Sequence, residues 1–148
     1  MSRLLYEKSV AYLGHLIIPY LFGTVDRESI YSYKLLSELG HKGIFHKAEN
    51  PAGMYSSSVD GIIEIAREHL EEYSDVLDSM EVFQQRYTYR DNLIIVYEMG
   101  GKYFYDHFKP DSLKNLAAPK IFKSKRECIN WIKKGLDRSR RDRQVKKA

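Results

Sequence analysis

Apolar residues in the first part of the chain recur at intervals of three and four, the spacing of one face of an α-helix. Residues 3–18 carry this pattern and predict a first helix, which Pro19 ends. A second helix is predicted over residues 27–39, with Asp26 as its N-cap and Gly40 just after its last turn. The chain up to Gly40 is therefore predicted to be largely helical.

The same spacing returns after a loop at residues 40–49 and predicts a third helix over residues 51–74. Asn50 is a natural N-cap, and Pro51 suits the first turn, where no backbone N–H is needed. The apolar stripe of this helix consists of Val59, Ile62, Ile63, Ala66, Leu70 and Tyr73. We expect this stripe to be core.

The pattern changes after residue 80 to runs of β-branched and aromatic residues at 82–89, 92–98 and 102–108. Gly100-Gly101 separates the last two runs, and paired glycines favour a tight turn with positive φ. The sequence therefore predicts an antiparallel hairpin over residues 92–108, with a third strand before it.

The last predicted element is a helix over residues 124–135. Ser124 and Glu127 form a capping box at its start, and Gly135 is expected to end it. Its apolar side needs a partner surface, which predicts dimerisation. Residues 136–148 have no apolar periodicity and are predicted to be disordered.

Three helices followed by a hairpin are the element order of a winged helix-turn-helix, an α+β fold. The predicted domains are a winged-helix DNA-binding domain at 1–111, a helical dimerisation segment at 112–136 and a disordered basic tail at 137–148. The sequence shows no internal repeat.

The charge of the chain is divided unevenly. Residues 1–113 carry 11 Lys/Arg against 17 Asp/Glu, and residues 114–148 carry 13 against 3. A basic segment of this kind suits a polyanionic partner, and a solubilising tail is the plainer interpretation. Cys128 is the one cysteine, and no apolar run approaches the length of a membrane span. We therefore expect a cytoplasmic protein with no membrane partner.

Small hydroxyl side chains precede the apolar stripe of the third helix. They would let the helix N-terminus approach phosphates closely, and serine can also bond to base edges. Basic residues of the 40–49 loop and of the predicted strands would add phosphate contacts. The predicted DNA-binding residues are Tyr55, Ser56, Ser57, Ser58, Lys42, Lys47, Arg86, Arg90, Lys102 and Tyr103.

Four short stretches resemble the motifs of PadR-type transcriptional regulators. They are "SYKLLSEL" (32–39), "NPAGMY" (50–55), "HLEEYSDVL" (69–77) and "GKYFYDHFKPD" (101–111). The resemblance implies a promoter-binding repressor that dimerises through its C-terminal helix and binds a palindromic or pseudo-palindromic duplex. A circadian clock modifier of this family has a similar length, so the resemblance also implies a role in clock gene expression.

The sequence gives only weak signals of metal binding or catalysis. His41, His46, His69 and His107 have no cysteine or carboxylate at a usual ligand spacing, and no nucleophile or phosphate-loop motif is present. No metal, cofactor or enzymatic activity is therefore predicted. The acidic body leaves one alternative open, a protein–protein interaction or small-molecule sensing module without DNA binding. Many of the 12 tyrosines lie in the predicted strands and could line a ligand pocket.

Overall fold

The computed structural model describes residues 3–147, and the side chains of residues 3–139. The strands are β1 (Val10–Tyr12), β2 (His15–Val25), β3 (Glu28–Ser37), β4 (Arg86–Tyr89), β5 (Asn92–Met99) and β6 (Lys102–Phe108). The α-helices of the described residues are α1 (Val59–Tyr73) and α2 (Lys125–Lys147). Short 3-10 helices lie at Tyr6–Lys8 (η1), Gly40–Lys42 (η2) and Val82–Gln85 (η3). The fold is α+β, as predicted.

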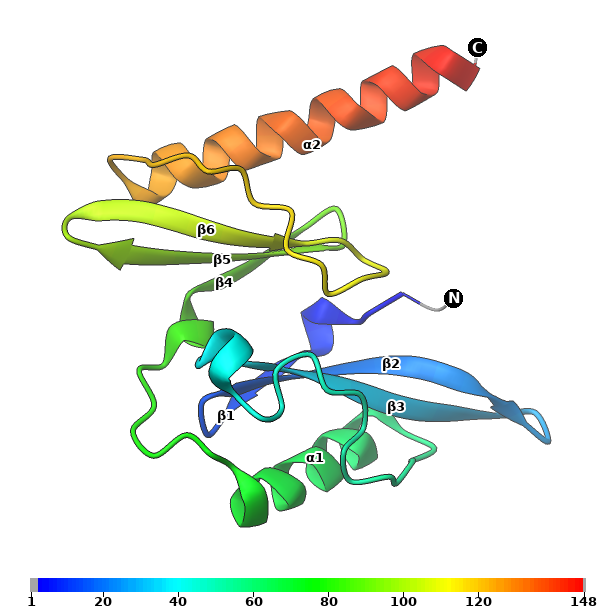
Figure 1. Ribbon diagram of the computed structural model, residues 1–148. Helices are drawn as coiled ribbons and strands as arrows, with labels where there is room; N and C mark the ends of the chain where they lie inside the picture. Colours follow the sequence, from blue (N-terminus) through cyan, green and yellow to red (C-terminus); the bar gives the residue numbers. More distant parts are fainter. Residues whose placement is uncertain (1–2, 148) are drawn as a thin grey trace.

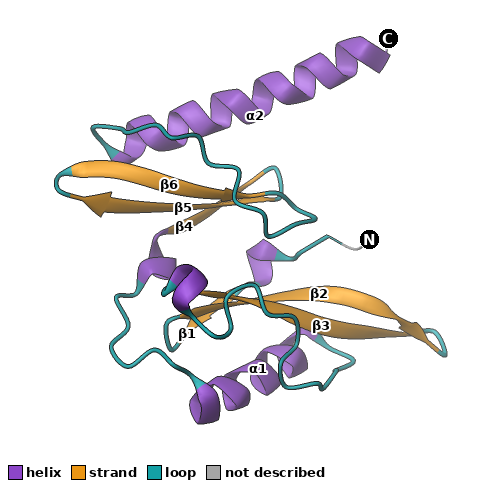
Figure 2. Cartoon of the chain, in the orientation of Figure 1, coloured by secondary structure: helices purple, strands orange, loops and turns teal. Residues whose placement is uncertain are grey.

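The elements form four layers, with two antiparallel sheets face to face and one helix on each outer face (Figures 1 and 2). The first sheet has the order β1-β2-β3 and the second the order β4-β5-β6. Leu16 of β2 and Leu93 of β5 lie in the core between the sheets. Ile17, the next residue after Leu16, lies instead in the core under α1. Neighbouring residues of β2 therefore face two different cores.

All four strand-to-strand turns contain two central residues with positive φ, the signature of type I′ turns. The turns are Leu13-Gly14, Asp26-Arg27, Arg90-Asp91 and Gly100-Gly101. Gly14 is also sterically required, since a Cβ there would lie 2.5 Å from a methyl carbon of Val76. These turns match the right-handed twist of the strands, so each sheet is a compact meander.

The two halves of the chain repeat one plan, β-β-β-connection-α. The connection after β3 returns along that strand with bridges at Lys34↔Glu49 and Tyr31↔Ser56. The connection after β6 does the same with bridges at Phe108↔Asn115 and Tyr103↔Phe122. Each connection ends in a serine N-cap, and the β2–β3 and β5–β6 hairpins point to opposite ends of the molecule (Figure 1). The two halves therefore form a structural repeat, although the sequence shows none.

The predicted helices at 3–18 and 27–39 are wrong, because β1, β2 and β3 occupy most of these residues. The cause is burial on both sides of the sheet, since His15–Tyr20 are all buried. Such a continuous apolar run has no polar alternation to mark a strand. Pro19 does not end β2, because the β1 ladder stops at the Val10↔Ile17 pair and nothing in β1 needs its missing N–H. The three-helix core of a winged helix-turn-helix is thus not confirmed.

The predictions for the third helix and the hairpin agree more closely with the structure. The helix begins at Val59, later than predicted, and ends at Tyr73, close to the predicted residue 74. Its stripe packs on the first sheet except for Tyr73, which is exposed and not part of the core. Its N-cap is Ser58, not Asn50, whose buried side chain instead donates hydrogen bonds to Ser32 and Met54. The hairpin around Gly100-Gly101 and the preceding strand are confirmed.

The last helix begins as predicted, with Ser124 Oγ accepting a hydrogen bond from the Glu127 amide at 3.1 Å. It does not end at Gly135, because α2 continues to Lys147 through the segment expected to be a disordered tail. Arg, Lys and Gln are good helix formers, and no proline follows to stop them. Among the described residues, no helix combines the length and the apolar character needed to cross a membrane.

Candidate nucleic-acid interface

The hydroxyl-rich segment before α1 has a structural role. Ser56 pairs with Tyr31 of β3 through two backbone hydrogen bonds of 2.7 and 3.3 Å. Ser58 caps α1 by accepting the Gly61 amide at 3.0 Å. Asp60, in the first turn of the helix, already supplies a negative charge at this end. The segment therefore joins α1 to the first sheet, and the negative charge of Asp60 disfavours a phosphate at the N-terminus of the helix.

Tyr55 and Ser57 are the members of this segment with exposed side chains that hold no cap or bridge in the described residues. The Tyr55 ring contacts Phe22 of β2 at a centroid distance of 4.8 Å. Phe22 is itself 57% exposed. Tyr55 therefore belongs to a small aromatic surface at the β2–β3 hairpin.

Arg86, predicted to contact phosphate, is half-buried and bound by other residues of the protein. Its guanidinium donates to Ser9 Oγ at 3.1 Å, to Ser9 O at 3.0 Å and to Phe83 O at 2.8 Å. Burial lowers the pKa of Arg86. Arg90 is exposed but is bound to Asp137 of α2, with Nε 2.6 Å from the carboxylate. Both arginines therefore already hold partners within the protein.

We expect Arg86→Gln to lower the free energy of unfolding by about 2–3 kcal/mol, because two backbone carbonyls lose their charged donor. Urea denaturation measures this loss, and Arg90→Gln, at an exposed ion pair, should change the midpoint far less. DNA affinity should be unchanged in Arg86→Gln. Intact stability with weakened DNA binding would instead return Arg86 to the interface.

The other predicted DNA contacts lie on separate surfaces. Lys102 follows the β5–β6 turn, at the opposite end of the molecule from the segment before α1 (Figure 1). The backbone of Tyr103 pairs with Phe122 through bonds of 2.9 and 3.0 Å. Lys42 and Lys47 lie on the loop after β3. No single duplex-facing surface collects the predicted residues.

The first half of α2 packs on the second sheet. Cys128 and Ile132 are buried there with Phe122, and Lys120 lies over the Trp131 ring at 4.7 Å from its centroid. The second sheet and the connection after β6 thus cover the apolar side of α2 that was expected to meet a second chain. The apolar side of α2 is therefore already packed within the chain and needs no second chain, and dimerisation stays a prediction.

Asp137 marks the end of this packed region, where it accepts hydrogen bonds from Tyr89 and Arg90. Beyond it the helix extends past the sheet and away from the body (Figure 1). We call residues 138–147 the distal segment of α2. It contains six Lys/Arg against one Asp. Cations also favour the C-terminal end of a helix, where the macrodipole is negative.

The residues considered for other chemistry are not assembled for it. Burial raises the pKa of the Cys128 thiol to about 11, so this cysteine is a packing residue with little thiolate at neutral pH. Within the described part of the chain, no three His, Cys, Asp or Glu side chains converge in a way that could hold a metal ion.

Comparison of the chain with protein-family models finds no match. Comparison with curated proteins and with solved structures finds no significant match either. The function must therefore be argued from the geometry of this chain.

Proposed function

We propose that the protein binds double-stranded DNA, with the distal segment of α2 as its main contact. The observation that carries this proposal is a helix that leaves the body after Asp137 and carries six Lys/Arg against one Asp. An α-helix fits the major groove, and lysine and arginine neutralise phosphates along its edges.

The charge distribution supports the same assignment. Residues 1–113, which include both sheets and α1, carry six more acidic than basic residues and would repel a duplex. A helix that extends away from this body keeps its cations at a distance from the repulsion, which salt screens beyond about 10 Å at 0.1 M. The direction of α2 therefore carries a basic segment away from the acidic body of residues 1–113.

A salt titration with a random duplex tests the proposal. If six cations of the distal segment neutralise phosphates, the log of the binding constant should fall with the log of salt concentration with a slope of about −5. Fluorescence anisotropy of a labelled 20-base-pair duplex measures this slope. Binding that is absent, or that has a slope near zero, would exclude an electrostatic DNA contact and favour the interaction or sensing module.

The finer function rests on the PadR resemblance. A promoter-specific repressor, acting as a homodimer on a palindromic site and tuning clock gene expression, needs base contacts in addition to phosphate contacts. The same anisotropy titration gives the stoichiometry. Two chains per short duplex would support the homodimer, and one chain would contradict it.

A further inference from the structure

A cleft of about 580 Å³ lies between the two halves of the molecule. One wall is the loop of residues 40–47 after β3, and the other is β6 with the connection that follows it. Leu36, Phe83 and Ile95 contribute an apolar floor. A concave site with an apolar floor and a few polar groups is typical of small-molecule binding.

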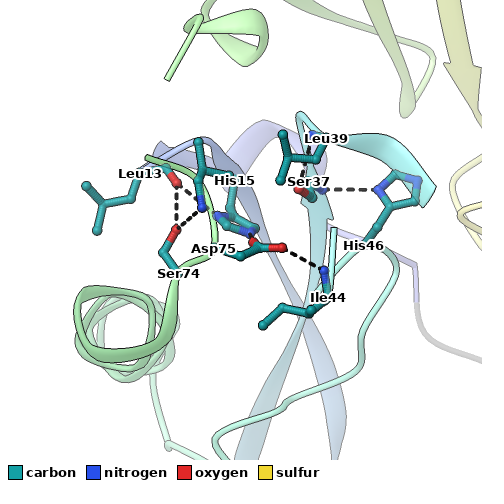
Figure 3. Close-up of polar contacts among 9 residues, drawn as sticks. Leu13, His15, Ser37, Leu39, Ile44, His46, Ser74 and Asp75 are labelled. Carbon is teal, nitrogen blue, oxygen red and sulfur yellow. Dashed lines mark hydrogen bonds and ion pairs between the residues drawn. The ribbon is translucent and has the colours of Figure 1, made fainter. Parts of the chain in front are cut away.

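The 40–47 loop is held in place by contacts from behind (Figure 3). Asp75, in the chain after α1, accepts the Ile44 amide at 2.9 Å, and its other oxygen faces the buried His15 ring at 3.7 Å. Gly43 packs against Ser37 so closely that a Cβ would lie 2.4 Å from its hydroxyl. The backbone of Lys47 bonds to Leu35 O at 2.7 Å. This wall of the cleft is therefore pre-formed.

The loop presents donors to the cleft. His46 Nδ1 accepts a hydrogen bond from the Ser37 amide at 3.1 Å, so the proton of the neutral ring is on Nε2 (Figure 3). Burial lowers the pKa of His46, and neighbouring Lys47 lowers it further. Lys47 and His41 also line the cleft. This wall can donate hydrogen bonds and carries positive charge.

The opposite wall presents an acceptor. Asn115 donates from Nδ2 to Asp106 Oδ1 at 2.8 Å, while its own oxygen accepts the amides of His107 and Ala117 at 3.0 Å each. Burial raises the pKa of Asp106. Within the described residues Asp106 forms no ion pair within 4.0 Å, although Lys47 and His46 line the same cleft. A half-buried carboxylate that is oriented by an amide and faces donors across a gap is suited to a ligand N–H.

Aromatic rings lie on the far side of Asp106. A second hollow of about 370 Å³ shares Asp106 and Asn115 with the cleft and is lined by Tyr97 and Phe104. These two rings are nearly parallel, with an interplanar angle of 15° and centroids 5.8 Å apart. The two hollows share Asp106 and Asn115 in their linings, and we call them together the groove, with aromatic surface at one end and Lys47 at the other.

We propose that this groove binds a nucleoside phosphate. The base would lie against Tyr97 and Phe104 and donate an N–H to Asp106, and the phosphate would lie toward Lys47 and His41. Each part of the groove matches one part of such a ligand, because aromatic faces stack with bases, carboxylates accept their N–H groups, and cations pair with phosphate. This site is separate from the distal segment of α2.

Isothermal titration of the full chain with mononucleotides tests the ligand class. Nucleoside monophosphates that carry an N–H donor on the base should bind at least ten-fold more tightly than either the matching nucleosides or inorganic phosphate. Equal affinity for nucleoside and nucleotide would overturn the phosphate contact. Binding of aromatic amino acids alone, or of none of these compounds, would overturn the assignment.

Variants at the two ends of the groove test the contact with the base and the contact with the phosphate separately. Asp106→Asn should weaken mononucleotide binding about ten-fold, the loss of one hydrogen bond to a charged group. Lys47→Met should weaken binding of the nucleotide but not of the nucleoside. Lys42→Met, on the same loop but outside the lining of the groove, is the matched control and should bind like the unmodified chain. Unchanged binding in Asp106→Asn and Lys47→Met, or an equal loss in all three, would overturn the site.

The Asp106→Asn variant also controls for folding. Burial raises the pKa of Asp106, which means that the folded state disfavours the ionised carboxylate. The protein therefore loses stability as the pH rises from the ordinary pKa of an aspartate to the raised pKa of Asp106. Replacing the carboxylate with an amide should therefore leave the urea midpoint at pH 7 unchanged or raised. Weaker nucleotide binding in a variant of undiminished stability would place the loss at the groove, and a lowered midpoint with unchanged affinity would contradict a ligand-binding role.

Discussion

A chain that ends at Asp137 is expected to bind random duplex DNA about a hundred-fold more weakly at low salt than the full chain. It loses six Lys/Arg and one Asp, and each lost phosphate contact lowers the magnitude of the log–log salt slope by about 0.9. The slope should therefore fall by about four or five. Anisotropy titrations of both chains with the same duplex measure both quantities.

The truncated chain should fold normally, because all the described contacts of α2 with the sheet lie before the cut. Cys128 and Ile132 remain buried, and Asp137 keeps its bonds to Tyr89 and Arg90. Equal urea midpoints for the two chains would confirm this. A large loss of stability would show that the distal segment is structural.

Two control variants identify the source of the affinity. A full-length chain with the six distal Lys/Arg replaced by Gln keeps the helix length and should bind as weakly as the truncated chain. Lys102→Ala, at the far end of the second sheet, should bind like the unmodified chain (Figure 1). If Lys102→Ala were the weaker binder, the contact would lie at the β5–β6 turn, as the sequence pattern predicts.

The sequence correctly predicts those elements whose structure depends on residues close together in the chain. Ser124 caps α2 because a side-chain acceptor at that position satisfies an amide of the first turn. Gly100-Gly101 marks the β5–β6 turn because glycine reaches positive φ without strain. The stripe of α1 has a clear helical period because only one side of this helix is covered.

The first sheet could not be predicted in this way, because its pattern is set by tertiary packing. Leu16 and Ile18 face the second sheet while Ile17 faces α1, so all three are buried and no alternation remains. The turns that flank β2 carry Leu13-Gly14 and Asp26-Arg27, in which Leu13 and Arg27 have no intrinsic preference for positive φ. The surrounding ladders impose these conformations.

Neither the structural repeat of the two halves nor the groove can be recognised from the sequence. The two halves share backbone plans, but equivalent positions hold different residues, such as Asp26-Arg27 and Gly100-Gly101 in the second turn of each meander. The groove joins Lys47 with Asp106, which are far apart in the chain and meet only because the two sheets pack face to face. Separation of this kind leaves no motif with a fixed spacing.

Because the two sheets pack face to face on one core, the two halves should unfold as one unit. Leu16→Ala in the first sheet and Leu93→Ala in the second should each lower the free energy of unfolding by about 3 kcal/mol. Both side chains are fully buried in the same core between the sheets, so a cavity on either side weakens the shared interface. For a domain whose total stability is about 5–15 kcal/mol, this is a large fraction.

Urea denaturation followed by far-ultraviolet circular dichroism and by Trp131 fluorescence tests this coupling. Trp131 lies on α2 in the second half, so Leu16→Ala, in the first half, should shift the fluorescence midpoint as much as the dichroism midpoint. Val25→Ala on β2 and Met99→Ala on β5 are matched controls, because these side chains are 60% and 62% exposed. A fluorescence transition that stays in place in Leu16→Ala would show that the second half folds alone. The groove would then lie between two independent units and could open without unfolding either.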